Sequence, residues 1–367
     1  MDYTDRIGLD FIRPDANRPG NYDFLHSGTW LVSQFKELGV RWNRVAFSWV
    51  LIQPEKETFD WAPYDRVVEA CAQSGIEILA TLGGHFDRPP VPAWAGESLK
   101  EVVDRNLAAL EHFVEAWVNR YKTSITYWEI LNEPRTFHKG LTVLDYVDKL
   151  LKPSYRIIKA ASPTAKVLPC AYNQLPIVGS KEDFWDAARG CYDIHNLHVY
   201  EDWGMFRSRA TADQEVETVQ AFRQLMVERG EGDKDFWVTE TGWWGTGSPT
   251  GSMYDLYKKD PVSGTIEALP SYTGRELLEH PIVAREDAQR AKWIKDVYPR
   301  MLSVPGCAQV YLWVSLDEFE DGYEPDAVYG QSTEDRPARQ VDMWGIIAGD
   351  KTWRKSAYAL QEMLKHG

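Results

Sequence analysis

The sequence predicts an α/β fold, a single (β/α)8 TIM barrel that spans residues 1–367 as one catalytic domain. Strand-like and helix-like segments alternate eight times along the chain, which is typical of a parallel sheet with right-handed crossovers. The expected strands are largely apolar, as when helices cover both faces of the sheet. No repeat or linker interrupts the alternation.

The expected strands are short and rich in β-branched and aromatic residues: 7–12, 40–49, 76–82, 125–131, 166–171, 193–200, 236–240 and 308–314. The expected helices carry apolar residues at helical spacing: 29–38, 64–73, 98–121, 141–161, 182–189, 212–229, 285–302 and 355–364. Residues 245–282 and 316–341 are expected to form long loops after strands seven and eight. Such loops commonly carry function.

The charge and hydropathy of the sequence limit the kinds of molecule that the protein is expected to bind. The net charge of −14 argues against nucleic acid, whose phosphates require basic patches. No apolar run reaches the roughly 18 residues needed to cross a membrane. Residues 1–7 are polar and lack a signal-peptide core, which favours a cytoplasmic location. Had a signal peptide been removed, the protein would be secreted.

Neither a metal nor a cofactor is expected. Cysteines 71, 170, 191 and 307 are widely scattered and form no CxxC pair. Histidines and carboxylates form no cluster with metal-ligand spacing. The 16 tryptophans are unusual, because flat aromatic rings stack on sugar rings. Most of them are nevertheless expected in the core.

Two glutamates stand at the ends of buried strands. Residues 125–131 run into Asn132, Glu133 and Pro134, and proline ends a strand because it lacks an N–H. Residues 236–239 likewise lead to Glu240 at the end of strand seven. The carboxyl ends of barrel strands meet on one face, where active sites lie. Glu133 and Glu240 are therefore expected to meet, although they are far apart in the chain.

A pair of carboxyl groups is the minimum equipment for cleaving a glycosidic bond. One group protonates the leaving oxygen, while the other supports the developing positive charge. A retaining enzyme places the two groups about 5–5.5 Å apart, and an inverting enzyme about 6.5–9.5 Å apart. The nucleophile must stay ionised, which a neighbouring arginine favours. Arg44, on the second expected strand, is a candidate for that arginine.

The motif Asn132-Glu133-Pro134, with a glutamate closing strand seven, resembles the clan A glycoside hydrolases. Residues 39–44, which read Gly-Val-Arg-Trp-Asn-Arg, are similar to family 39 and related branches. Residues 344–347, which read Trp-Gly-Ile-Ile, are similar to the end of many clan A barrels. The resemblance covers nearly the whole chain and implies a retaining (β/α)8 enzyme.

The resemblance also implies roles for particular residues. Glu133 would be the acid/base and Glu240 the nucleophile. Asn132 would bind the 2-hydroxyl of the substrate, and Arg44 would keep Glu240 ionised. His198 and Tyr200 match a His-x-Tyr motif on strand six, whose tyrosine commonly touches the nucleophile. Trp313, on strand eight, matches the aromatic floor of the −1 subsite.

Other residues have weaker signals. His85 could bind a sugar hydroxyl or be an ordinary loop residue. At least one of Trp243 and Trp244 is expected to line the cleft. Glu129 shares strand parity with Glu133, so it is expected to point into the barrel and pair with an arginine. His195 is expected in the core.

The sequence thus predicts a retaining glycoside hydrolase that cleaves β-glycosidic bonds of oligosaccharides or polysaccharides. Two alternatives use the same site: a transglycosylase, and a sugar-binding barrel without catalysis. Loss of either carboxylate would mark the silent barrel, and both are present. Product analysis at high acceptor concentration separates transfer from hydrolysis.

Overall fold

The structure, a computed structural model of the chain, describes residues 3–11, 24–83, 91–133, 140–169, 184–200, 212–243, 257–259, 266–268, 281–316, 345–348 and 351–366. Eight parallel strands form one sheet in the order β5-β4-β3-β2-β1-β10-β7-β6. Their bounds are β1 Ile7–Asp10, β2 Trp42–Phe47, β3 Glu77–Leu82, β4 Tyr127–Glu129, β5 Lys166–Leu168, β6 His195–Val199, β7 Phe236–Thr241 and β10 Cys307–Leu312.

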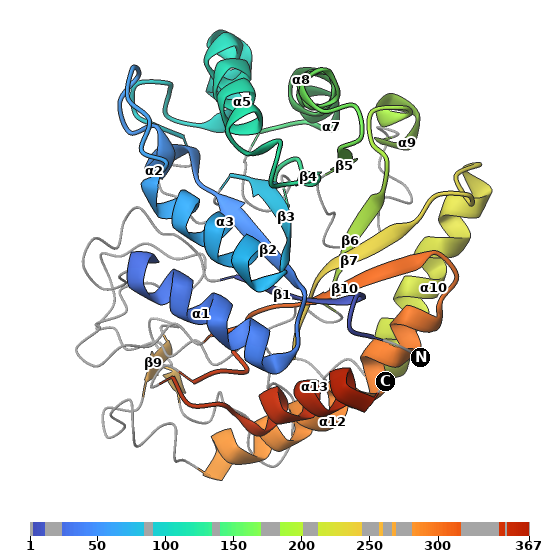
Figure 1. The fold of residues 1–367 in the computed structure, drawn as a ribbon. Helices are drawn as coiled ribbons and strands as arrows, with labels where there is room; N and C mark the ends of the chain where they lie inside the picture. The colour runs from blue at the N-terminus through green and yellow to red at the C-terminus, as the bar shows by residue number, and fades with distance from the viewer. Residues whose placement is uncertain are drawn as a thin grey trace.

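The edges of this sheet come together. The backbone N–H groups of Asp193 and Ile194, just before β6, donate to the carbonyl of Val167 in β5 over 2.8 and 3.3 Å. Helices surround the strands, as Figure 1 shows. The predicted (β/α)8 barrel is therefore confirmed. The two ends of the chain lie close together, since Thr4 Oγ1 donates to the carbonyl of Leu364.

The helices of the described residues are α1 Phe24–Leu38, α2 Trp49–Ile52, α3 Ala62–Ser74, α4 Leu99–Arg105, α5 Leu107–Tyr121, α7 Val143–Tyr146, η1 Val147–Leu151, α8 Lys152–Ala161, α9 Phe184–Ala188, α10 Ala212–Glu228, α12 Pro281–Ser303 and α13 Lys355–His366. A two-stranded antiparallel ribbon, β8 Tyr257–Lys259 with β9 Ile266–Ala268, lies within the expected loop 245–282. Almost all of the expected loop 316–341 lies outside the described residues. None of the described helices is long and apolar enough to span a bilayer.

Several expected elements differ in detail. The single helix expected over 98–121 is wrong: Asn106 has a φ of −139°, which separates α4 from α5. The expected strand 40–49 ends earlier, because Ser48 caps the short helix α2. Pro153 lies in the first turn of α8, directly after a π-helical segment, η1.

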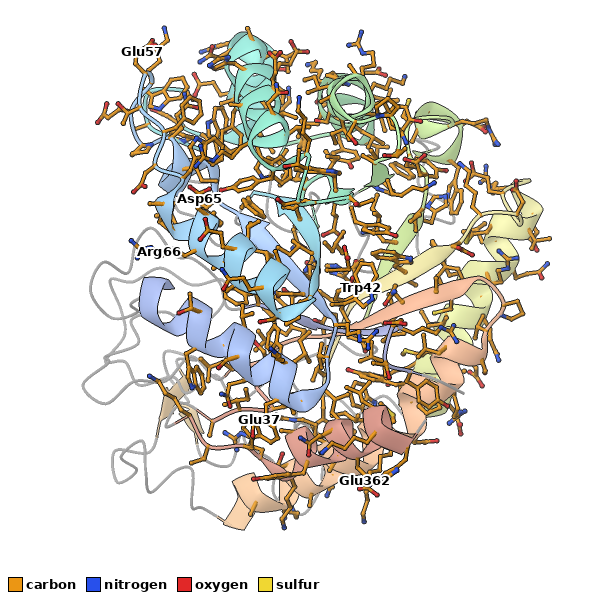
Figure 2. The ribbon with its side chains drawn as sticks, viewed as in Figure 1. Glu37, Trp42, Glu57, Asp65, Arg66 and Glu362 are labelled. Atoms are coloured by element: carbon orange, nitrogen blue, oxygen red, sulfur yellow. The ribbon has the colours of Figure 1, made fainter. Side chains whose placement is uncertain are left out.

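The interior of the barrel has two layers because strand residues alternate in direction. Near the start of the strands the layer is apolar and half aromatic, with Trp42 inside the ring of strands in Figure 2. Gly8 faces this layer, and a Cβ there would lie 2.3 Å from Cε1 of Tyr311. The members of this layer are Trp42, Leu79, Leu168, Ile194, Trp237 and Tyr311.

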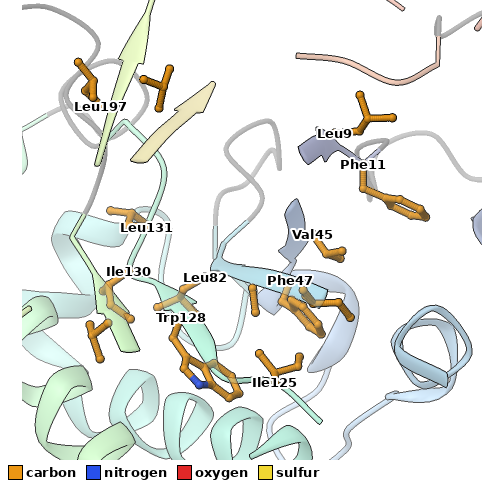
Figure 3. Close-up of a cluster of buried hydrophobic side chains, with 14 of the residues drawn as sticks. Leu9, Phe11, Val45, Phe47, Leu82, Ile125, Trp128, Ile130, Leu131 and Leu197 are labelled. Carbon is orange, nitrogen blue, oxygen red and sulfur yellow. The ribbon is translucent and has the colours of Figure 1, made fainter. Parts of the chain in front are cut away.

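Two residues further along the same strands, the buried interior side chains become polar. Arg44 follows Trp42, and Asp10 follows Gly8. Outside the strands, apolar side chains such as Phe47 and Trp128 pack between strands and helices (Figure 3). The apolar interior layer and the apolar packing outside the strands together fix the position of the polar layer along the barrel axis.

The expected core position of His195 is confirmed, since it is only 2% exposed. Its Nε2 lies 2.7 Å from Glu231, between α10 and β7, and the Tyr192 hydroxyl also donates to Glu231. Burial opposes ionisation of Glu231, but these hydrogen bonds outweigh it and lower the pKa of Glu231 to about 2.

We predict that Glu231→Gln removes a pH-dependent part of stability. Because the folded pKa lies below the ordinary value of 4.5, this stabilisation is present above pH 4.5 and is lost as the pH falls towards 2. Urea unfolding should show the variant less stable by about 1–3 kcal/mol at pH 6, with a smaller difference at pH 3. The exposed Glu362→Gln is the control, and equal behaviour of both variants would contradict the assignment.

Candidate active site

Arg44 lies at the centre of the polar layer and is only 3% exposed. Its Nη1 donates to Asp10 Oδ2 over 2.7 Å and to Glu240 Oε1 over 2.5 Å. Its Nη2 donates to Asn132 Oδ1 over 2.6 Å. Its Nε and Nη2 both lie 2.7 Å from Glu129 Oε2. The sequence-based expectations that Arg44 reaches Glu240, and that an arginine pairs with Glu129, are both confirmed.

These contacts also set the charges of the cluster. Burial alone would lower the pKa of Arg44, but the charges of Glu129, Asp10 and Glu240 outweigh it and raise that pKa well above its ordinary value. The pKa of Asp10 is also raised, because burial outweighs the attraction of Arg44. Arg44 is thus a permanent cation that several buried carboxyl groups share.

The two candidate catalytic carboxyl groups meet beside Arg44. Ligand atoms of Glu133, His198 and Glu240 all lie within 4.8 Å of one another, and all three residues are buried. Carboxyl oxygens this near to each other suit a retaining glycosidase, in which the two carboxyl groups lie about 5–5.5 Å apart. The same spacing could suit a cation, but Arg44 already contacts Glu240.

Both oxygens of the Glu240 carboxyl group are held. Oε1 accepts from Arg44, and Oε2 accepts from the Tyr200 hydroxyl over 3.1 Å. Two donors on one carboxylate favour its ionised form. The predicted positions of Arg44 and Tyr200 around Glu240 are therefore confirmed.

His198 lies between the two glutamates. Its Nδ1 is hydrogen-bonded to Glu133 Oε1 and lies 3.3 Å from Glu240 Oε2. Burial and, second, the charge of Arg44 hold the pKa of His198 well below its ordinary value. The imidazole is therefore neutral, so it can orient Glu133 without adding a positive charge to the acid.

The backbone after β4 gives Glu133 its direction. The expected strand 125–131 ends earlier, at Glu129. Beyond it, Leu131 and Glu133 have φ values of 75° and 42°, in a region that ordinary residues rarely adopt. The Tyr146 hydroxyl donates to the carbonyl of Ile130 over 2.8 Å. The turn after the strand, rather than strand parity, therefore points Glu133 at the site.

Asp10, Thr81 and Asn196 belong to the site but were not identified from sequence. Thr81 Oγ1 donates to Glu129 Oε2 over 2.5 Å, and Asn196 Nδ2 donates to Glu129 Oε1. Polar residues at inward positions of otherwise apolar strands are the signal that could have found them.

The structure describes only some of the remaining predicted site residues. Trp313 is buried beside Val314, and Tyr200 packs against them. Trp243 is half-buried, with its ring 5.9 Å from that of Trp293 on α12. His85 and Trp244 lie outside the described residues.

Comparisons with known proteins agree with this geometry. Residues 29–127 match a family model described as glycoside hydrolase family 42, β-galactosidase. An endo-1,4-β-xylanase of Gibberella zeae is 29% identical over 136 residues, which cover 35% of this chain and 36% of that protein. An aryl-phospho-β-D-glucosidase of Bacillus subtilis is 30% identical over 118 residues, which cover 30% of this chain and 24% of that protein. Each match thus spans well under half of its relative.

Solved structures match over nearly the whole chain. A family 39 glycoside hydrolase of Bacteroides cellulosilyticus has a TM-score of 0.60 and 15% identity, with 99% of this chain and 64% of that chain covered. A β-xylosidase of Caulobacter crescentus has a TM-score of 0.63 and 18% identity, with 97% and 70% covered. At such identities these two matches show the barrel fold.

The family model, the glycosidase relatives and the barrel together confirm the resemblance to clan A glycoside hydrolases. The fold is thus a (β/α)8 barrel, and parts of the chain are similar to glycoside hydrolases of clan A.

We predict that Arg44→Lys lowers kcat/KM by about 10²–10³-fold, because lysine cannot reproduce the planar donors that hold Glu240, Asn132 and Glu129 together. Steady-state kinetics on aryl β-glycosides measure the effect. The control is Arg120→Lys, which changes an exposed arginine paired with Asp65. An Arg44→Lys variant within threefold of wild type would show that the guanidinium is dispensable.

Proposed function

We propose that the protein is a retaining glycosidase that cleaves β-glycosidic bonds by double displacement. The observation that carries this proposal is the buried pair Glu133 and Glu240, whose nearest ligand atoms lie within 4.8 Å. A pair this close suits direct attack by one carboxylate on the anomeric carbon better than attack by an intervening water.

In the first step, Glu240 attacks the anomeric carbon while Glu133 gives its proton to the departing glycosidic oxygen. The Glu240–carbon bond forms as the carbon–oxygen bond breaks, which leaves a glycosyl-enzyme. Arg44 and Tyr200 support this assignment, because their donors favour an ionised Glu240 before attack.

In the second step, Glu133 is ionised and removes a proton from water. The water oxygen attacks the anomeric carbon, and the Glu240 carboxylate leaves. The neutral His198 suits both steps, since its hydrogen bond keeps Glu133 in place whether the carboxyl group is protonated or not.

Asn132 is proposed to bind the 2-hydroxyl of the sugar at the −1 subsite. Its Oδ1 is engaged by Arg44, while its buried Nδ2 has no partner within the described part of the chain. A buried amide nitrogen of this kind normally has a hydrogen-bond acceptor. The names of the relatives, which include xylanases and a glucosidase, favour β-xylosides and β-glucosides as the first substrates to test.

Glu240→Gly tests the proposal most simply. We expect hydrolysis of aryl β-glycosides to fall by about 10³-fold or more, because the attacking group is gone. Azide should restore turnover by entering the vacated space and attacking the anomeric carbon, which gives an α-glycosyl azide.

The control for this experiment is the exposed Glu217→Gln on α10, which should leave turnover unchanged. Undiminished hydrolysis by Glu240→Gly would end the proposal. Sugar binding by wild type without any turnover would instead favour a silent barrel.

A further inference from the structure

Asp10 is a buried carboxyl residue that the proposed reaction does not use. It ends β1, is 4% exposed and lies beside Arg44 in the sheet, since the two residues are register partners. Its backbone is fixed on both sides. The N–H of Phe11 donates to the carbonyl of Arg44 over 2.9 Å, and the N–H of Ser315 donates to the carbonyl of Asp10 over 3.2 Å.

The guanidinium of Arg44 has five N–H donors in one plane. Nε donates to Glu129 Oε2, which also lies 2.7 Å from Nη2, and Nη2 donates to Asn132. The two donors of Nη1 go to Asp10 and Glu240. Asp10 therefore shares one nitrogen atom with the nucleophile.

The two edges of the guanidinium are anchored differently. Glu129 holds the Nε edge and is itself held by Thr81 and Asn196. At Nη1 the contacts within the described residues are Asp10 and Glu240. Glu240 has to move slightly as it bonds to the sugar, so it cannot serve as a fixed anchor. Asp10 is the contact at Nη1 that stays in place through the reaction.

We propose that Asp10 is a positioning residue for the nucleophile, because it fixes the Arg44 nitrogen that faces Glu240. This inference rests on the proposed glycosidase function. Without Asp10, Nη1 would have one acceptor fewer, and the guanidinium could turn about its Glu129 edge. The charge that supports Glu240 would then no longer be held at the distance seen in the structure.

Burial raises the pKa of Asp10 even against the attraction of Arg44, but the proposed role requires only an oxygen that accepts the Nη1 hydrogen bond. The other charged groups acting on Asp10 are Arg44, Glu240 and Glu129. Asparagine has the shape of a neutral aspartic acid, and its amide oxygen can accept the same N–H of Arg44. Alanine cannot accept it.

The test compares Asp10→Ala with Asp10→Asn on two aryl β-glycosides, one with a phenyl and one with an activated dinitrophenyl leaving group. We expect Asp10→Ala to lower kcat/KM by about 10–100-fold on both, because attack by a displaced Glu240 limits either substrate. Asp10→Asn should stay within about fivefold of wild type.

Two further variants make the result specific. Glu133→Ala should slow the phenyl glycoside far more than the dinitrophenyl glycoside, since the activated leaving group needs no proton. Asp287→Ala is the control for a buried aspartate remote from the site. Asp287 accepts from the backbone N–H of Lys355 over 2.7 Å at the start of α13, so its loss should alter stability but not kcat/KM.

Three outcomes would overturn the inference while wild type remains active. The kcat/KM of a folded Asp10→Ala variant could stay within twofold of the wild-type value. Alternatively, kcat/KM could fall on the phenyl glycoside but not on the dinitrophenyl glycoside. If Asp10→Ala does not fold, a folded Asp10→Asn with a loss above about tenfold would overturn it equally. A wild-type protein that hydrolyses no aryl β-glycoside would instead refute the proposed function.

Discussion

The structure depends on one buried cation. Arg44 is almost fully shielded from water, and a buried charge is tolerated only when it is paired and hydrogen-bonded. Its partners come from β1, the end of β4 and β7. The same contacts that satisfy the charge therefore bring together segments that are far apart in sequence, including the proposed nucleophile and the residue next to the proposed acid.

The barrel makes this arrangement possible through its two interior layers. Aromatic side chains such as Trp42 and Trp237 fill the barrel interior near the start of the strands. The polar side chains two residues further along each strand are therefore kept near the carboxyl ends of the strands. The polar layer lies at the carboxyl ends of the strands, where the loops begin. Rigid strands thus hold Arg44, Glu240 and His198, which suits a reaction that requires fixed distances.

Much of the fold followed from periodicity, because eight alternations of strand and helix leave few topologies. The meeting of Glu133 and Glu240 followed from the same topology. The break at Asn106 did not, because a single residue with non-helical backbone interrupts an otherwise helical pattern. The left-handed turn at Leu131 was also missed, since no glycine marks it.

The partners of Arg44 could be predicted only in part. Glu129 was expected from strand parity, and Glu240 from a resemblance to known enzymes. Asp10 was missed, and so was Asn196, which contacts Glu129 rather than Arg44. Both were missed because cross-barrel contacts depend on the stagger between strands. A register shift between β6 and β7, at Leu197 and His198, changes which side chains face each other. The sequence around these residues carries no signal from which that register shift could be predicted.

The central claim is that two carboxyl groups lie at the separation of a retaining enzyme. Proton NMR of the sugar first released from an aryl β-glycoside tests it most directly, before mutarotation mixes the anomers. The account predicts the β-anomer, because two inversions at the same carbon restore the original configuration. Initial release of the α-anomer would contradict it.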